Sequence, residues 1–545
     1  MRRFLPFVVI LIVVLLYTKP YFRTGFFATQ DGEWSIVRLA EMQREIKDLQ
    51  VPPRWSDYLN HGYGYPLFSF TYPAPFYIGI LFRLAHIGLT DSIKIIFVAS
   101  VCFSAIFMFL LGRELAGDYA GFLSAVFYTV APFRLVDLYV RGSIGESLSL
   151  AIFPLLFYLS LKYILKPTSV RMVLCSFVLA FMILAHNIMA LVFFPFWIVF
   201  LYVSVISYFE DIKFYSWRYF LPMILLGLGL AAYFYMPALL EKNYLILSQI
   251  KLADVSKNFI RLPDYLLSPW SWGDKPSFQL GWAHILAGIV GFISLMVSSE
   301  IDRKKYMPLA IFIISSIAVL IFFAHPFSAD FWNAPPLSWL DFPWRLLTPL
   351  AFFLAMSSIF LSTHKNTRII GGILVVVTVI FSLNFAHPDV YINKPDVYYA
   401  TNDATTTSKD ELMPIWVKEK PENRYTGPKA VLAKAKSTLY NLQYNSHEIS
   451  FRTITEQSNT VTINTIYFPG WKFYVGGVEV PIDYLSSPQG LITINIPVGN
   501  KLVEGKFTET PVRFWSDMIS LFSLLAAVVL LLRSLVLRLI KRPSA

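Results

Sequence analysis

The sequence predicts a polytopic α-helical membrane protein with a small β-sandwich domain near its C-terminus. Of the 545 residues, 56% are hydrophobic and only 15% are charged, and the mean hydropathy is +0.56. Apolar runs long enough to cross a hydrocarbon core of about 30 Å recur along most of the chain. A late segment instead alternates polar and apolar residues, which is typical of half-buried strands. This combination excludes a soluble enzyme.

Twelve apolar runs are the expected membrane spans. The first follows Arg2-Arg3 and has no small-residue cleavage site after it, so we expect an uncleaved span and not a signal peptide. The others lie near residues 91–112, 117–133, 144–163, 170–186, 188–207, 217–237, 282–298, 306–324, 346–362, 368–386 and 514–535. A shorter run near 72–88 contains two prolines and an arginine, and we expect it to dip into or lie along the outer leaflet.

The positions of the basic residues predict the orientation. With twelve spans, the short turns on one side hold 17 basic and 6 acidic residues, so they carry the net charge of +11 of the whole chain. The positive-inside rule places these turns and both termini in the cytoplasm of a plasma-membrane protein. The large loops 21–90, 238–281 and 325–345 and the segment 387–513 are then extracytoplasmic. The excess charge reflects topology, and no nucleic-acid partner is expected.

Three parts follow from these boundaries. Residues 1–386 form a transmembrane domain, residues 387–513 an outer domain that is mainly β from about residue 438, and residues 514–545 the last span with a basic tail. In the outer domain, the aromatic residues of Phe468–Lys472 either fill the sandwich core or bind glycan, and we favour the core.

The first outer loop places two carboxylates at the expected mouth of the bundle. Asp31 and Glu33 precede an apolar stripe with helical spacing, Ile36, Leu39 and Met42, which indicates a helix lying on the membrane surface. Asp31 is either the N-cap of this helix or a functional acid that faces a site.

An aromatic and glycine-rich stretch follows in the same loop. It contains Arg54 and Tyr65. Aromatic side chains at this level are interfacial anchors in most membrane proteins, and they also stack on sugar rings. Trp270, in the loop 238–281, belongs to a segment that either closes over a ligand or anchors the loop at the interface.

Charges in the second outer loop lie at or just inside the expected membrane boundary. Asp137, Arg141 and Glu146 are costly there without a partner or a water-filled cavity. A carboxylate beside an arginine suits a reaction with a phosphate leaving group, since one takes a proton and the other grips phosphate oxygens. The alternative is a structural ion pair.

Two further polar groups lie at outer ends of spans. His186-Asn187 follows the fifth span, where a lone histidine is more often structural, and Asp341 and Arg345 begin the tenth. No Walker loop, dinucleotide-binding motif or zinc-ligand spacing accompanies them. Cys102 and Cys175 lie inside apolar runs, so no disulfide framework is expected.

These features resemble the GT-C superfamily of membrane glycosyltransferases, which place an acidic residue on a first outer loop after one span. Asp31, with Glu33, matches that position. More narrowly, the chain is similar to the membrane family labelled "6-pyruvoyl-tetrahydropterin synthase-related" and to YfhO-like proteins. The matching segments are Tyr63–Leu67, Arg141–Glu146, Ala185–Asn187, Leu340–Arg345 and Tyr467–Lys472. The eight histidines form no zinc cluster, so pterin chemistry is not expected.

The resemblance implies an enzyme that transfers a sugar from a polyprenyl-phosphate-linked donor to a glycan, lipid or protein acceptor of the cell envelope. Candidate catalytic residues are Asp31, Glu33, Asp137 and Glu146. Candidates for binding the donor phosphate or sugar are Arg54, Tyr65, Arg141, His186, Asn187, Trp270, Asp341 and Arg345. Asp31-Gly32-Glu33 departs from an Asp-x-Asp motif, so a divalent metal such as Mg²⁺ or Mn²⁺ is left open, with Asp31 and Glu33 as its ligands if one binds.

Two other functions stay open at this point. One is a transporter or flippase for lipid-linked glycan intermediates, in which the intramembrane charges line a path. The other is a non-catalytic envelope assembly factor that presents the β domain to a partner. In each case membrane lipids surround the chain.

Overall fold

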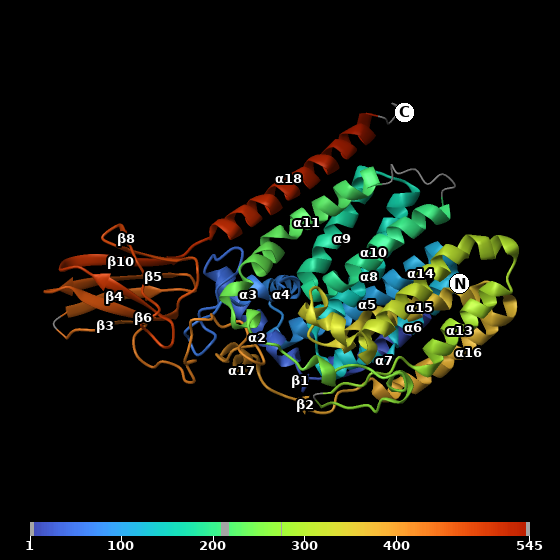
Figure 1. Ribbon diagram of the computed structural model, residues 1–545, viewed down its shortest axis with the longest axis horizontal. Helices are drawn as coiled ribbons and strands as arrows, with labels where there is room; N and C mark the ends of the chain where they lie inside the picture. The colour runs from blue at the N-terminus through green and yellow to red at the C-terminus, as the bar shows by residue number, and fades with distance from the viewer. Residues whose placement is uncertain (1–4, 209–216, 274, 436, 541–545) are drawn as a thin grey trace.

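A computed structural model shows a helical bundle with a β-sandwich at one end of its long axis (Figure 1). The structure describes residues 5–208, 217–273, 275–435 and 437–540. Some of the charged residues that were counted for the expected cytoplasmic turns lie outside these ranges. They are Arg2, Arg3, Glu210, Asp211, Lys213, Lys541 and Arg542.

Every one of the twelve apolar runs is helical, because a backbone in lipid must satisfy its own hydrogen bonds. The helices are α1 (Leu5–Thr18), α5 (Leu89–Ala116), α6 (Asp118–Thr129) with α7 (Pro132–Val136), α8 (Ile144–Leu165), α9 (Ser169–Ala185), α10 (Asn187–Tyr208), α11 (Trp217–Leu240), α13 (Trp282–Met296), α14 (Glu300–Ala324), α15 (Leu347–Ser357), α16 (Lys365–Ser382) and α18 (Pro511–Ile540). The chain is therefore a polytopic helical membrane protein, as the sequence predicts.

Not all twelve helices are equally long. Within the described residues, nine segments are long and apolar enough to cross a membrane, and α6 with α7 would make a tenth, bent by 44°. The apolar helices α9 and α13 have 17 and 15 residues. At 1.5 Å per residue they reach about 26 and 22 Å, short of a core of about 30 Å.

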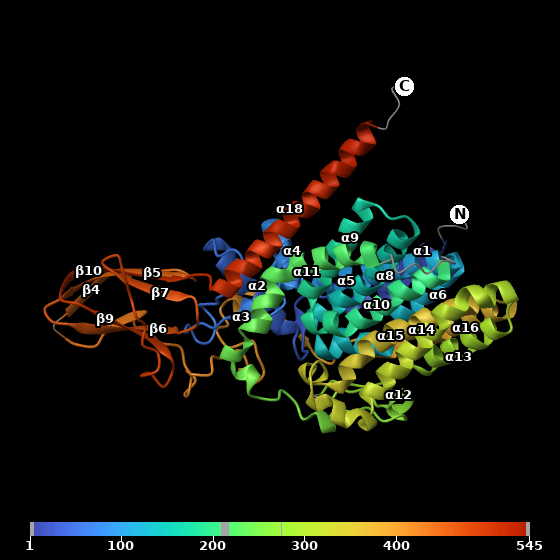
Figure 2. The ribbon, with the colours of Figure 1, turned by 45° about the horizontal axis from the view of Figure 1, so that its top comes forward.

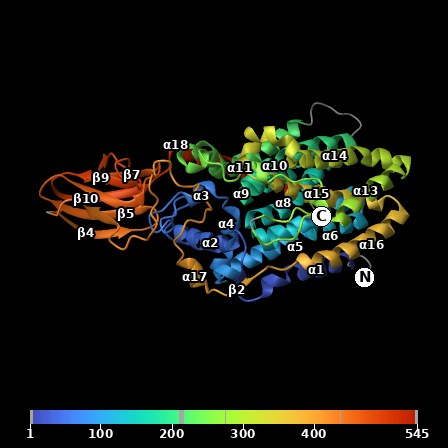
Figure 3. The same ribbon diagram turned by 60° about the horizontal axis from the view of Figure 1, so that its bottom comes forward.

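The spans differ in how far other helices surround them. The stretch Pro343–Ser362, which includes α15, lies at the centre of the bundle with most of its residues buried. At the edge, α1 lies beside α16 (Figure 3), and the Tyr17 hydroxyl donates to the Val379 carbonyl at 2.7 Å. The last helix α18 leaves the bundle along its length (Figure 2), and almost all of its span is exposed to the surroundings.

The first outer segment covers the end of the bundle that faces the β-sandwich. Its elements are β1 (Phe26–Phe27), α2 (Gly32–Lys47), α3 (Leu67–Phe70) and α4 (Ala74–Leu84), and the segment 387–513 adds β2 (Tyr391–Ile392) and α17 (Asp396–Ala400). The loop 238–281 contains α12 (Asp264–Leu267). Strands β1 and β2 pair antiparallel, with Phe26 opposite Ile392. Segments far apart in the sequence thus join into one cap.

The environment of α2 corrects one expectation. Ile36, Leu39 and Met42 of its apolar stripe are fully buried against protein, so this face does not lie on the membrane surface. Gly79 of α4 permits the approach, since a Cβ there would be 2.6 Å from a methyl carbon of Leu39. Helix α4 has 11 residues, about 16 Å, which is too short to cross. Amphipathic spacing alone does not distinguish a lipid-facing stripe from a protein-facing one.

The C-terminal outer domain is a sandwich of two antiparallel sheets. Its strands are β3 (Ala430–Leu432), β4 (Ser437–Tyr444), β5 (Glu448–Thr455), β6 (Asn459–Ile466), β7 (Trp471–Val475), β8 (Val478–Val480), β9 (Leu491–Ile496) and β10 (Gly499–Phe507). The sheet orders are β4-β5-β10-β7-β8 and β3-β6-β9. Inward residues such as Phe451, Ile463 and Ile494 are buried, as the alternating pattern predicts.

The aromatic residues of Phe468–Lys472 are core residues, as favoured from the sequence, and they also form the joint with the first outer loop. Trp55 of that loop is fully buried and contacts Phe468, Trp471 and Phe507, with ring centroids 5.4–6.4 Å apart. Gly64 is required beside it, since a Cβ there would lie 2.7 Å from the indole. The sandwich is therefore fixed to the cap by an apolar contact.

A buried ion-pair network ties the last helix to this joint. Arg513, at the start of α18, is fully buried and bonds Glu241, at the end of α11, through Nε at 2.9 Å. Arg54 bonds Glu509 at 2.9 Å and Asp517 at 2.7 Å. Since these charges are removed from water, each depends on its partner.

Replacing Glu241 by glutamine should therefore destabilise the protein. The substitution leaves the Arg513 guanidinium buried without a countercharge, which costs about 3 kcal/mol or more. We expect the midpoint of thermal unfolding of the purified protein in detergent to fall by several degrees. Glu300→Gln is the matched control, because its pair with Lys304 is exposed on both sides. Equal midpoints for the two variants would contradict the role of this network.

Candidate functional site

The site is built around a break between α7 and α8. The chain forms a π-helical turn at Asp137–Arg141 and then Gly142, whose φ is 62°. A Cβ on Gly142 would collide with the Thr29 hydroxyl and lie 2.8 Å from the Gly32 nitrogen. Glycine is thus needed both for the left-handed backbone and for the close approach of the first outer loop.

Two backbone hydrogen bonds join the first outer loop to the π-helical turn at this point. The Gln30 amide donates to the Val140 carbonyl at 3.0 Å, and the Asp31 amide donates to the Arg141 carbonyl at 2.7 Å. Asp31 is consequently held beside Arg141 by main-chain contacts, although 110 residues separate them in the sequence. The segments that carry the predicted charges of the first and second outer loops meet at this point.

Arg141 lies between two carboxylates in the protein interior. Its Nη1 donates to Asp137 at 3.0 Å and also bonds Glu146, and all three side chains are at least 96% buried. The Trp344 ring lies 4.7 Å from the guanidinium. Ser147 donates to the second oxygen of Asp137 at 2.8 Å. The structural ion pair considered from the sequence is therefore present, and it orients the arginine.

Not every polar atom of this cluster has a partner. Glu146 Oε1 and Arg345 Nε are buried, and neither bonds any residue that the structure describes. Arg345 donates through Nη1 to the Leu340 carbonyl at 2.6 Å and forms a long ion pair with Asp341 at 3.6 Å. Burial raises the pKa of Asp341, while Arg345 opposes this rise. Arg345 thus keeps a donor that a ligand could use.

Asp31 occupies the N-cap position of α2, but its carboxylate does not cap the helix. The Thr29 hydroxyl accepts from the Gly32 amide instead, at 2.9 Å. Within the described part of the chain, no group donates a hydrogen bond to the Asp31 carboxylate. Its electrostatic neighbours are Arg141 and Arg345. The capping alternative is therefore wrong, and the carboxylate is free to accept a proton from a ligand.

Tyr72, between α3 and α4, is a member of the site that the sequence did not reveal. Its ring stacks on His186, with centroids 4.8 Å apart, and a Cβ on Gly145 would lie 2.6 Å from the same ring. The hydroxyl bonds no described residue and lies within electrostatic range of Asp31 and Arg141. Burial raises the pKa of Tyr72 to about 12, so the phenol is a hydrogen-bond donor at neutral pH.

His186 supports this ring. Its Nδ1 accepts from the Met189 amide at 3.3 Å, and burial lowers its pKa to about 3. The histidine is therefore neutral at physiological pH, which suits a stacking partner better than a proton donor. Asn187 follows it as the first residue of α10.

Arg38, further along α2, is a second member of the site that the sequence did not reveal. It donates through Nε to the Thr406 hydroxyl at 3.0 Å and is an electrostatic neighbour of Tyr72. The Tyr65 hydroxyl is 2.9 Å from the same threonine oxygen. Tyr65, fully buried, thus lies behind Arg38 and contributes to the position of this arginine.

Three predicted residues lie away from Asp31. Arg54 belongs to the joint with α18, where two carboxylates neutralise it. Glu33 accepts from the Tyr399 hydroxyl at 3.0 Å and faces α17. Trp270 stacks on Phe385 at 4.7 Å. The loop that carries this tryptophan does reach the site, since Gly273 accepts from the Gln30 side chain at 3.1 Å.

The donor set does not form a metal site. Asp31 and Glu33 point toward different partners, the former toward arginines and the latter toward α17. Among the residues that the structure describes, no three His, Cys, Asp or Glu side chains come close enough together to hold a metal ion. The function proposed below uses none.

Comparison with known proteins adds the following. No family model matches the chain, so the narrower resemblance to the pterin-synthase-related and YfhO-like families stays a prediction. An uncharacterized protein of Lactococcus lactis subsp. cremoris is 24% identical over 284 residues, 51% of this chain and 44% of that protein. The chain thus spans less than half of the length of this relative.

Two solved structures show similarity in fold. The arabinofuranosyltransferase AftD from Mycobacteria has a TM-score of 0.44 and 14% identity, over 71% of this chain and 27% of that one. The archaeal oligosaccharyltransferase AglB from Archaeoglobus fulgidus, in complex with an inhibitory peptide and a dolichol-phosphate, has a TM-score of 0.41 and 13% identity, over 76% and 61%.

Proposed function

We propose that the chain is a membrane glycosyltransferase that moves a sugar from a polyprenyl-phosphate-linked donor to a hydroxyl-bearing glycan, lipid or protein acceptor of the cell envelope. One observation carries this proposal. The Asp31 carboxylate, which accepts no hydrogen bond from the described residues, lies within electrostatic range of Arg345, whose Nε is buried and bonds no described residue. An available base next to an available guanidinium donor is what transfer from a phosphate leaving group needs.

The reaction assigns a role to each member of the pair. Asp31 takes the proton of the acceptor hydroxyl while the acceptor oxygen forms a bond to the anomeric carbon. The bond from that carbon to the donor phosphate oxygen breaks, and its electron pair leaves with the polyprenyl phosphate. Arg345 stabilises the charge on this phosphate through its unpartnered Nε.

The surrounding groups keep this pair in place. Arg141 is neutralised by Asp137 and Glu146, so it contributes a fixed guanidinium beside Asp31 more than a mobile clamp. The ion pair of Arg345 with Asp341 is long, at 3.6 Å, so a phosphate can replace that carboxylate at little cost. Arg345 is therefore the stronger of the two predicted phosphate-binding arginines.

The orientation of the site is part of the proposal. Asp31 lies at the end of the bundle that faces the β-sandwich, and the charge distribution of the sequence supports an extracytoplasmic location for that end. Donor and acceptor would then meet at the outer face of a plasma membrane. The lipid chain of the donor would remain in the bilayer beside the bundle.

Asp31→Asn should abolish transfer without unfolding the protein. Asparagine keeps the size of the side chain but cannot accept the proton, and general-base catalysis contributes about 10²–10⁴ in rate. The measurement is the release of polyprenyl phosphate from a panel of polyprenyl-phosphate sugars by the purified protein in nanodiscs. Asp254→Asn, at an exposed position of the loop 238–281, is the control.

Unchanged release from Asp31→Asn would contradict the assignment of the base. Absence of release from every donor by the wild type, with movement of lipid-linked sugars across vesicles instead, would favour the transporter. Neither activity, with a β-sandwich that captures an envelope protein, would favour the assembly factor.

Tyr72→Phe tests whether the phenol contacts the reacting groups. Phenylalanine keeps the stack on His186 but removes the hydroxyl, and a hydrogen bond to a charged group contributes about 1.5–3 kcal/mol. We expect kcat/KM for the donor to fall at least about tenfold with no change in the midpoint of thermal unfolding. Tyr72→Ala, which also removes the ring, should lower both. A phenylalanine variant with wild-type kcat/KM would show that the hydroxyl does not contact substrate.

A further inference from the structure

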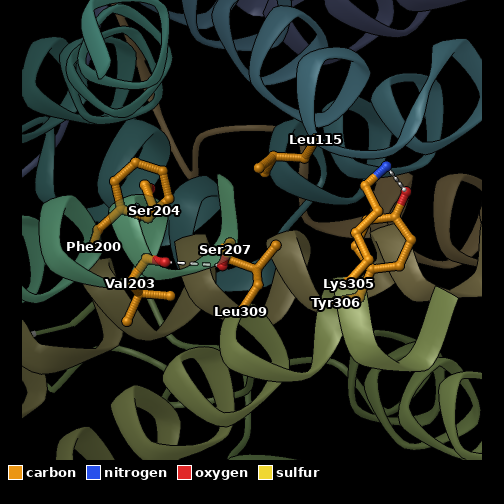
Figure 4. Close-up of a pocket in the computed structure, with 8 residues that line it drawn as sticks. All are labelled: Leu115, Phe200, Val203, Ser204, Ser207, Lys305, Tyr306 and Leu309. Carbon is orange, nitrogen blue, oxygen red and sulfur yellow. Dashed lines mark hydrogen bonds between the residues drawn. The ribbon is translucent and has the colours of Figure 1, made fainter. Parts of the chain in front are cut away.

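A pocket lies where α5 and α10 end and α14 begins, and Figure 4 shows the residues that line it. It is partly open to the surroundings and lies between the last turns of α5 and α10 and the first turns of α14. Its lining residues are Leu115, Phe200, Val203, Ser204, Ser207, Lys305, Tyr306 and Leu309.

The spans themselves place this cavity at a membrane boundary. Leu115 and Ser207 are among the last residues of the spans Leu89–Ala116 and Asn187–Ser207. Lys305 lies in the first two turns of the span Glu300–Ala324. Ends of three spans therefore meet at one level, which is the level of lipid headgroups.

The polar groups of the cavity are hydrogen-bond donors. Lys305 Nζ donates to the Tyr306 hydroxyl oxygen at 3.2 Å and lies 4.8 Å from the centroid of the Tyr306 ring. Within the described residues, no carboxylate pairs with this ammonium. Ser204 is buried and bonds no described residue, whereas the Ser207 hydroxyl donates to the Val203 carbonyl at 2.8 Å. Lys305, Tyr306 and Ser204 can thus donate to an anion.

The described acidic residues nearby have other partners. Glu300 bonds Lys304 at 2.7 Å, Glu114, next to Leu115, bonds Lys162 at 3.0 Å, and Asp302 accepts from the Ser299 hydroxyl at 2.8 Å. The remaining wall of the cavity is apolar. An ammonium over apolar walls at the level of headgroups fits a molecule with a phosphate at one end and hydrocarbon at the other.

We propose that this cavity binds one anionic phospholipid of the bilayer, with its phosphate at Lys305 and its acyl chains along α10 and α14. The outer surfaces of these helices expose apolar side chains for such contacts, including Tyr202, Ile311 and Ile314. The basic run that contains Arg303 and Lys304 adds a favourable potential. This lipid site is separate from the Asp31 site and does not depend on the function proposed for it.

The test uses the full chain, stripped of lipid in a neutral detergent. Phosphatidylglycerol and phosphatidylcholine are titrated separately, and binding is followed by native mass spectrometry together with the midpoint of thermal unfolding. We expect phosphatidylglycerol to bind more tightly and to raise the midpoint. Lys305→Gln should weaken its binding about fivefold. Lys304→Gln is the matched control, because that lysine is exposed and paired with Glu300.

A second variant separates the cavity from the surface charge. Ser204→Leu places a larger apolar side chain among the lining residues and should also weaken phosphatidylglycerol while leaving Lys305 in place. Equal weakening by Lys304→Gln and Lys305→Gln would overturn the proposal in favour of nonspecific attraction. Equal affinity for the two lipids, or displacement of phosphatidylglycerol by millimolar inorganic phosphate, would also overturn it, the latter in favour of a free-anion site.

Discussion

The burial of Arg141 between Asp137 and Glu146 is the interaction on which the candidate site depends. A guanidinium inside a helical membrane protein is tolerated only with countercharges, and these two carboxylates supply them at Nη1. Because the triad spans the π-helical turn and the first turn of α8, it fixes the break between two helices. The carbonyl of the same arginine then receives the Asp31 amide. The position of the proposed base is thus a consequence of how the bundle accommodates a buried charge.

Much of the fold could be predicted because lipid and the β-sheet each impose a simple pattern. Length and apolarity identified the twelve helical runs, and period-two alternation identified the sandwich, since neither depends on distant residues. The environment of α2 could not be predicted in this way. Its stripe at Ile36, Leu39 and Met42 has the same spacing whether lipid or protein covers it, and the covering surface comes from α4 and α5.

The charged residues of the site could be predicted, because charges near the membrane are unusual. Asp137, Arg141, Glu146 and Arg345 stood out for that reason, and Arg141 and Arg345 do lie within electrostatic range of Asp31. Arg54 is also a charged residue of an outer loop, yet its partners Glu509 and Asp517 lie more than 450 residues later. The sequence around Arg54 therefore does not show its structural role. Tyr72 shows the opposite case, because one tyrosine among 30 carries no signal until the fold stacks it on His186.

The Asp31 site and the β-sandwich are connected through α2 and the first outer loop. Thr406, in the segment that leads to the sandwich, receives the Arg38 guanidinium, and Arg38 is an electrostatic neighbour of Tyr72. At the other end of the same loop, Trp55 packs into the sandwich joint. A displacement of the sandwich would therefore reach Arg38 and Trp55, which both follow Asp31 in the same loop. Since Asp31 is held by main-chain bonds to a rigid helix break, the site resists such a displacement, and the sandwich is better suited to position an acceptor against a fixed base than to move the base itself.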